Sequence, residues 1–229
     1  MTPIDALLQF RQETMRFLAA QNVLLAAEVM ARNGNADLQD RFDRFAKHGK
    51  PIYKDLYEYL CAHLFVAYVS SFEVFLQSVC AFVVRRHPKK LGATQFRLSD
   101  VLDAGDSNRL VERAIEEYLN RMMYKKPMEY LDDLCNLLSI ERQPLDEGWK
   151  VFVEAKARRD LGAHAGWRCN AIYLRKIQEA DAISTLKLGD LGVPDTETYL
   201  DNVAKSLDKL ATDFVDRVIA VHGDGSNEP

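Results

Sequence analysis

The chain has 229 residues, of which 48% are hydrophobic and 28% are charged, and its formal net charge is −4 at pH 7. This length fits one sizeable domain or at most two small ones, and the composition argues against wholesale disorder. An acidic chain has no overall attraction for nucleic acid, so nucleic-acid binding would require a local basic patch.

Apolar residues recur at helical spacing along almost the whole chain. In chain order, helices are predicted over residues 4–31, 36–48, 51–86, 107–123, 127–139, 145–164, 168–180 and, after a cap at Asp195 or Thr196, up to about Val221. Residues 87–106 are expected to be rich in loops, and 184–192 to contain a short extended piece. No repeat or linker divides the chain. We therefore predict an all-α fold, a single helical bundle over residues 1–222 with a disordered tail at 223–229.

One predicted helix is apolar enough to resemble a membrane span. Residues 61–84 have a suitable length, but Glu73 lies at the centre and would be costly in lipid. A helix that is apolar on all sides is typical of the centre of a bundle, so we predict a buried core helix and no membrane attachment. Asp5 and Arg11 interrupt the apolar N-terminus, which argues against a signal peptide.

The four cysteines lie far apart with no C-x-x-C pattern, which favours reduced thiols and no metal site. Reduced thiols together with the absence of an apparent targeting segment predict a cytoplasmic protein.

The stretch AKARRDLGAHAGWRCN, residues 155–170, carries the main candidate for chemistry. His164 is of the type that moves protons near neutral pH, and the planar guanidinium of Arg159 suits the charge that builds on phosphate oxygens. Asp160 can accept a hydrogen bond from Arg159 or His164 and orient it. These three residues predict RNA cleavage with the RNA 2′-hydroxyl as nucleophile, and with neither a cofactor nor a metal.

The spacing of this pair is not specific by itself, because Arg217 and His222 repeat it. Five residues on an ideal helix turn about 140°, so Arg159 and His164 do not share one face. A long arginine side chain, or a distortion near Gly162, has to make up the difference.

The surroundings of the pair are basic. Between Lys150 and Lys176 the sequence has seven basic residues and two acidic ones, and Arg85 to Arg97 adds five more bases. Basic strips with aromatic residues such as Trp167 between them can hold single-stranded RNA by phosphate contacts and base stacking.

The stretch RRDLGAHAGWRCNAIYL, residues 158–174, resembles the signature of the HEPN superfamily of helical nucleotide-binding proteins. That signature is an arginine, a polar residue, several further residues and a histidine. In one branch a glycine, a polar residue and a tyrosine follow, and Gly166, Asn170 and Tyr173 match them. YVSSFEVFLQSV is similar to a helix of that branch in which an acidic residue, here Glu73, follows an aromatic one.

The resemblance implies an all-α, HEPN-like fold that forms a homodimer, with Arg159 and His164 of two chains around one cleft. It implies a metal-independent endoribonuclease of a toxin–antitoxin or phage-defence system, with RNA as substrate and an antitoxin or neighbouring defence protein as a possible partner. A carboxylate in an apolar helix has to be paired, so Glu73 is expected to be buried beside a structural hydrogen-bond partner; the other interpretation is that it orients Arg159. The residues expected to bind RNA are Lys156, Arg158, Arg168, Asn170 and Tyr173. The alternative function is a non-catalytic helical module that binds a partner protein or a nucleotide.

Overall fold

A computed structural model describes residues 1–48, 53, 56–92, 106–194 and 197–224. Its elements are α1 (Pro3–Arg32), α2 (Ala36–His48), α3 (Leu56–Arg86), the 3₁₀ helix η1 (Pro88–Leu91), α5 (Ser107–Met123), α6 (Pro127–Leu138), α7 (Leu145–His164), α8 (Ala171–Glu179) and α9 (Glu197–His222). The described part of the chain contains no strand, which confirms the predicted all-α fold. The predicted helix start at Pro51, the cap at Asp195 or Thr196 and residues 225–229 of the predicted tail lie outside the described residues.

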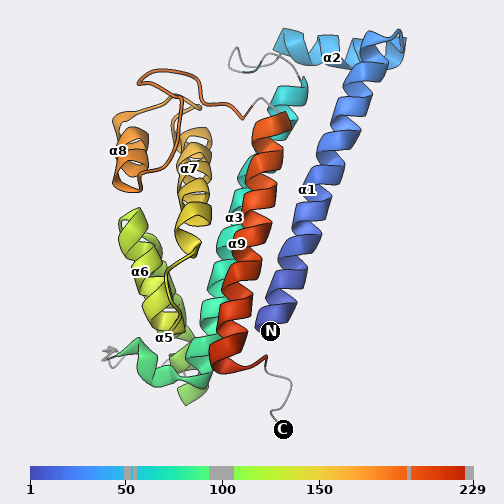
Figure 1. Cartoon of the computed structure of the whole chain (residues 1–229). Coiled ribbons are helices and arrows are strands. Elements are labelled where there is room, and N and C mark those ends of the chain that lie inside the picture. The colour runs from blue at the N-terminus through green and yellow to red at the C-terminus, as the bar shows by residue number, and fades with distance from the viewer. Residues whose placement is uncertain (49–52, 54–55, 93–105, 195–196, 225–229) are drawn as a thin grey trace.

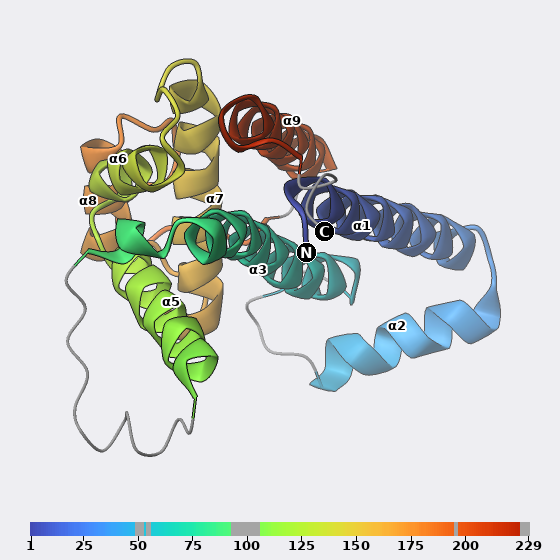
Figure 2. The same cartoon turned by 90° about the horizontal axis from the view of Figure 1, so that it is seen from below.

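The bundle is built around α3 (Figures 1 and 2). Helices α1 and α9 run beside α3, and α7 packs against both α3 and α9. Helices α6 and α8 lie on the far side of α7 from α1, while α2 crosses the end of α1. One continuous apolar core joins side chains of α1, α3, α5, α6, α7 and α9. The site described below lies where α3, α5, α6, α7 and α8 meet.

Helix α3 occupies the centre because buried apolar side chains lie around most of its circumference. The ring of Phe72 packs against Phe10 of α1 at 5.2 Å and against Phe152 of α7 at 4.8 Å between ring centroids. The helix is long and apolar enough to cross a membrane by length and composition, but 61% of its most apolar window is buried inside the protein. The predicted buried core helix is therefore confirmed.

The chain reverses direction directly after α7. Gly166 and Trp167 both have positive φ, at 54° and 63°, and the N–H groups of Ala165 and Trp167 both donate to the carbonyl of Leu161 at 2.9 Å. This turn folds the Trp167 indole back onto α7, where it is 2% exposed and donates its Nε1–H to the hydroxyl of Tyr53 at 2.9 Å.

Gly162 has a packing role rather than the distorting role that the sequence allowed. Helix α7 continues through it to His164. A Cβ at Gly162 would lie 2.4 Å from the Trp167 ring, so only glycine leaves room for the indole.

Replacing Gly162 by alanine is expected to lower the free energy of unfolding by about 1–3 kcal/mol, because the buried ring must move. Urea denaturation measures this change. Gly148→Ala, also on α7, is the matched control: its Cβ would meet the Leu210 side chain at 3.1 Å, so a smaller loss or a gain is expected. Equal effects of the two substitutions would contradict the packing role of Gly162.

Two predicted elements near α8 need correction. The helix begins at Ala171 rather than at residue 168, because the Asn170 side chain caps it by accepting the Tyr173 N–H at 2.9 Å. Within 184–192 the structure has turns and no strand, with one isolated bridge between Leu191 and Arg168. The N–H of Cys169 donates to the carbonyl of Asp190 at 2.8 Å, which ties this loop to the end of α7.

Candidate functional site

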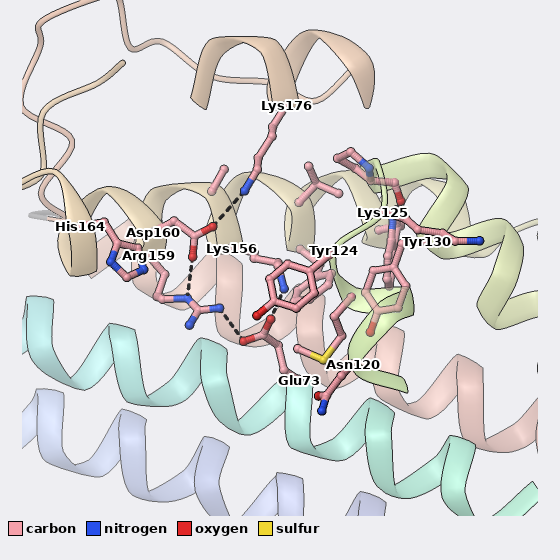
Figure 3. Close-up of a pocket in the computed structure, with 16 residues that line it drawn as sticks. Glu73, Asn120, Tyr124, Lys125, Tyr130, Lys156, Arg159, Asp160, His164 and Lys176 are labelled. Atoms are coloured by element: carbon pink, nitrogen blue, oxygen red, sulfur yellow. Dashed lines mark hydrogen bonds and ion pairs between the residues drawn. The ribbon is translucent and has the colours of Figure 1, made fainter. Parts of the chain in front are cut away.

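A pocket of about 490 Å³ opens between α7 and the helices around it (Figure 3). Its volume falls in the usual range for small-molecule sites. The pocket is lined by Glu73, Asn120, Met123, Tyr124, Lys125, Pro127, Tyr130, Trp149, Phe152, Val153, Lys156, Ala157, Arg159, Asp160, His164 and Lys176.

Helix α7 supplies the polar wall of this pocket. Lys156, Asp160 and His164 are four residues apart and therefore share one helix face. Arg159 starts about 140° around the helix from His164, and its long side chain nevertheless lines the same pocket. Because α7 stays helical through His164, the reach of the arginine brings the two predicted catalytic residues to one pocket, and no helix distortion is needed.

A carboxylate of the central helix holds the arginine. Glu73 is 6% exposed and accepts hydrogen bonds from Arg159 Nη2 at 2.5 Å and from Lys156 Nζ. Burying a carboxylate in an apolar helix is costly unless cations or donors compensate, and these two cations compensate it. The contact between Glu73 and Arg159 is the one expected if Glu73 orients the arginine, and Lys156 shares the carboxylate.

Asp160 continues the same charge cluster. Its Oδ1 lies 3.3 Å from Arg159 Nε, and its Oδ2 accepts from Lys176 Nζ of α8 at 3.0 Å. Arg159 Nε is buried and forms no hydrogen bond within the described residues, because the approach of Asp160 lacks the required geometry. Of the two partners that the sequence allowed for Asp160, the structure thus places Arg159 in contact, together with Lys176. The cluster contains three cations and two carboxylates.

His164 ends α7 at the rim of the pocket and is exposed. Figure 3 shows its ring beside the Arg159 side chain, at the opposite end of the pocket from Tyr130. The second arginine–histidine pair lies elsewhere: His222 donates its Nε2–H to the carbonyl of Leu138 at 2.7 Å and lines no part of this pocket. Burial lowers the pKa of His222 below its ordinary value.

The opposite face of α7 carries a buried network of Glu154, Arg158, Tyr173 and Tyr199, here called the Glu154 network. Glu154 accepts from Arg158 Nε at 2.8 Å and from the hydroxyls of Tyr173 and Tyr199 at 2.7 Å each. The Arg158 guanidinium lies 4.3 Å from the centre of the Tyr199 ring. Although burial disfavours the charged guanidinium, Tyr199 and Glu154 raise the pKa of Arg158 above its ordinary value.

This network contains two of the residues that were predicted to bind RNA, Arg158 and Tyr173. Tyr173 is 1% exposed, so its ring cannot stack on a base, and burial and then the Glu154 charge raise the pKa of its phenol. Arg158 donates its Nε–H to Glu154 and lies over the Tyr199 ring, and it does not line the pocket. The two arginines are adjacent in sequence but about 100° apart on the helix, so Arg158 belongs to the core and Arg159 to the pocket.

The other residues that were expected to contact RNA lie in different environments, some buried and some exposed. Asn170 is a helix cap, and Trp167, which was expected to help hold RNA, is buried against Gly162. Arg168 is exposed and donates to the carbonyl of Gly189 at 3.4 Å. Lys156 is the only residue of the predicted RNA-binding set that lines the pocket.

Carboxylates of α7 and of other segments neutralise much of the basic strip. Lys150 lies 3.1 Å from both Glu147 and Asp181, and Arg85 pairs with Glu112 at 2.6 Å. Residues 93–97 of the second basic stretch lie outside the described part of the chain. The excess of positive charge in the sequence is therefore smaller on the folded surface.

No family model, curated protein or solved structure matches this chain. The assignment of a function therefore rests on the geometry of the pocket and on the resemblance of its residues to a known motif.

Sequence reasoning missed several residues of the pocket. Tyr124 is 91% exposed and, with Lys125, lies in the turn between α5 and α6, while Asn120 comes from the last turns of α5. An aromatic residue beside two lysines in MMYKKP is a weak signal for a binding loop. That signal gains meaning only once the turn is known to face Lys156 of α7.

The arrangement can hold an anion and move a proton. The charge cluster has one more cation than carboxylate, and an imidazole stands at its open end. No group of three or more His, Cys, Asp and Glu side chains in the described residues is placed to hold a metal ion. The residues present supply acid–base and electrostatic chemistry.

Proposed function

We propose that this protein is a cytoplasmic, metal-independent endoribonuclease of HEPN type. One observation carries the proposal: the arginine and the histidine of the motif line the same pocket, within a charge cluster that has an excess of positive charge. The proposed family rests on the resemblance of residues 158–174, and the proposed location of the reaction is the pocket.

The reaction is an internal transesterification. The RNA 2′-hydroxyl attacks the adjacent phosphorus, the bond from phosphorus to the 5′-oxygen breaks, and a base accepts the proton of the 2′-hydroxyl. The departing 5′-oxygen receives a proton from an acid, which leaves a 2′,3′-cyclic phosphate and a 5′-hydroxyl. His164 moves protons in this step, and Arg159 stabilises the negative charge on the phosphate oxygens. Asp160 and Glu73 position Arg159.

A second copy of the chain completes the proposed site. The reaction needs both an acid and a base, and the described pocket contains one histidine. His164 is exposed at the rim of the pocket, where a second chain can approach it. A homodimer would place two copies of Arg159 and His164 around one RNA strand. A toxin–antitoxin or phage-defence role, with an antitoxin or neighbouring defence protein as partner, rests on the resemblance alone.

The alternative is a non-catalytic helical module that binds a nucleotide or a partner protein. The contacts of Arg159 favour the partner-protein form of this alternative, because Glu73 and Asp160 already surround its guanidinium. A phosphate has to compete with two carboxylates for this arginine.

The test is cleavage of a labelled single-stranded RNA in EDTA. We expect cleavage without divalent metal, products ending in a 2′,3′-cyclic phosphate, and no cleavage of DNA of the same sequence, since DNA lacks the nucleophile. Gel electrophoresis and mass spectrometry of the fragments measure these results. Cleavage that requires added divalent metal, or equal cleavage of DNA, would contradict the mechanism. A pure, folded protein that binds nucleotides but cuts no RNA would favour the alternative.

A further inference from the structure

The pocket has two chemically different ends (Figure 3). Arg159, Asp160 and His164 form the charged end. Tyr124 and Asn120 lie further along the pocket, toward Tyr130 and Lys125, where aromatic and amide groups join the ionic ones. A ligand that fills the whole pocket therefore needs both an anionic group and a flat, partly polar ring.

The aromatic groups at the second end play different parts. Tyr130 and Trp149 are buried and pack edge to face at 5.2 Å between ring centroids, so they form a fixed floor. The Trp149 Nε1–H donates to the carbonyl of Pro127 at 2.9 Å, which holds this floor in place. Tyr124 stands at the rim and is 91% exposed, so its ring faces remain available to a ligand.

An exposed aromatic side chain alone is ordinary, and its position is what matters here. Tyr124 projects over the pocket close to Lys156 and Glu73, between the polar wall of α7 and the amide of Asn120 (Figure 3). An amide offers both donors and an acceptor to the edge of a base, and an aromatic ring stacks on its face. Lys156 and Arg159 are the cations that line the pocket from α7, so they can contact the phosphate of a nucleotide whose base stacks on Tyr124.

We propose that Tyr124 and Asn120 form a nucleobase subsite, in which a base stacks on Tyr124 while its phosphate lies near Lys156 and Arg159. This inference deepens the proposed function and rests on it for the identity of the ligand as a nucleotide. Stacking tolerates any base, so the subsite favours nucleotides over sugar phosphates more than it favours one base over another.

The experiment compares binding of adenosine monophosphate and ribose 5-phosphate, which differ by the base. NMR titration or calorimetry measures both affinities for the wild-type protein and for Tyr124→Ala. We expect the wild-type protein to bind the nucleotide more tightly by about 5- to 150-fold, the range for one stacked base. Tyr124→Ala should abolish this preference and leave the affinity for ribose 5-phosphate unchanged. Tyr124→Phe should retain the preference, because the phenyl ring also stacks.

Ile183→Ala is the matched control, because Ile183 is also 91% exposed and lies outside this pocket. It should leave both affinities unchanged. Equal binding of the two ligands by the wild-type protein, no binding of either, or a preference that survives Tyr124→Ala would overturn the subsite. The RNA cleavage assay separates the two proposals. Cleavage without a nucleotide preference removes the subsite alone, whereas a Tyr124-dependent preference without cleavage removes the nuclease and keeps the subsite.

Discussion

Replacing His164 by alanine is expected to lower RNA cleavage by about 10²- to 10⁴-fold, the usual effect of losing a general acid or base. The histidine is exposed at the last residue of α7, so the substitution removes little packing and the fold should survive. Initial cleavage rates in EDTA measure the loss, and circular dichroism checks the fold.

His63→Ala is the matched control for this variant. His63 is also exposed, on α3, where its Nδ1 lies 2.7 Å from the carbonyl of Tyr59, and it lines no part of the pocket. Its loss should leave cleavage unchanged. If the His164→Ala protein cuts RNA at the wild-type rate, histidine is not the proton-moving group and the proposed mechanism is wrong.

The same variant tests the composite site. An excess of His164→Ala chains mixed with wild-type chains should lower wild-type cleavage severalfold, because mixed dimers lack one of the two histidines. An equal excess of His63→Ala should not lower it, and saturating RNA excludes competition for substrate. Light scattering should give twice the 26.1 kDa mass of one chain. A monomer whose activity is unaffected by inactive chains would contradict the dimeric site and leave the role of His164 intact.

Replacing Glu154 by alanine is expected to lower the free energy of unfolding by about 3–5 kcal/mol. Arg158 remains charged, since a guanidinium does not release its proton in proteins, and the substitution leaves this charge buried without its carboxylate. The hydroxyls of Tyr173 and Tyr199 lose their acceptor at the same time. Urea denaturation followed by circular dichroism measures the loss.

Glu112→Ala is the control for Glu154→Ala, because it removes one partner of the exposed pair with Arg85. An exposed ion pair contributes about 0–1 kcal/mol, so this change should be small. If the two substitutions destabilise the protein equally, the Glu154 network is no more important to the fold than a surface pair. Cleavage by the folded fraction of Glu154→Ala should be unchanged, because the network lies on the face of α7 away from the pocket.

Most of the helices are visible in the sequence because their apolar spacing is regular. The first two helices and α5, α6 and α7 match the predicted ranges within a residue. The central position of α3 also follows from composition, because a helix that is apolar on all sides has to be surrounded. The start of α8 was predicted too early, because Asn170 caps the helix and the backbone of Arg168 and Cys169 pairs with the loop at 189–191 instead.

Only the part of the candidate site that lies on α7 was predictable from the sequence. Arg159 and His164 lie on α7, and their spacing and residue types are readable there. Which of the adjacent arginines faces a pocket depends on what packs against each side of α7: Arg159 meets Glu73 of α3, whereas Arg158 meets Tyr199 of α9 and pairs with Glu154 of α7 itself. The position of Tyr124 depends on how α5 and α6 pack on α3 beside α7, and no local pattern encodes that packing.

The placement of the two tryptophans gives the protein an intrinsic fluorescence signal that can follow ligand binding. Trp149 lies in the pocket wall, and Trp167 lies against Gly162 at the end of α7, near His164. Both indoles are buried and both donate a hydrogen bond, so they share a dry, rigid environment in the folded state. The fluorescence of Trp149 should change when a ligand ring binds beside it in the pocket. The fluorescence of Trp167 should change when the turn after α7 moves. Single Trp→Phe variants separate the two signals and allow ligand binding to be followed without any attached label.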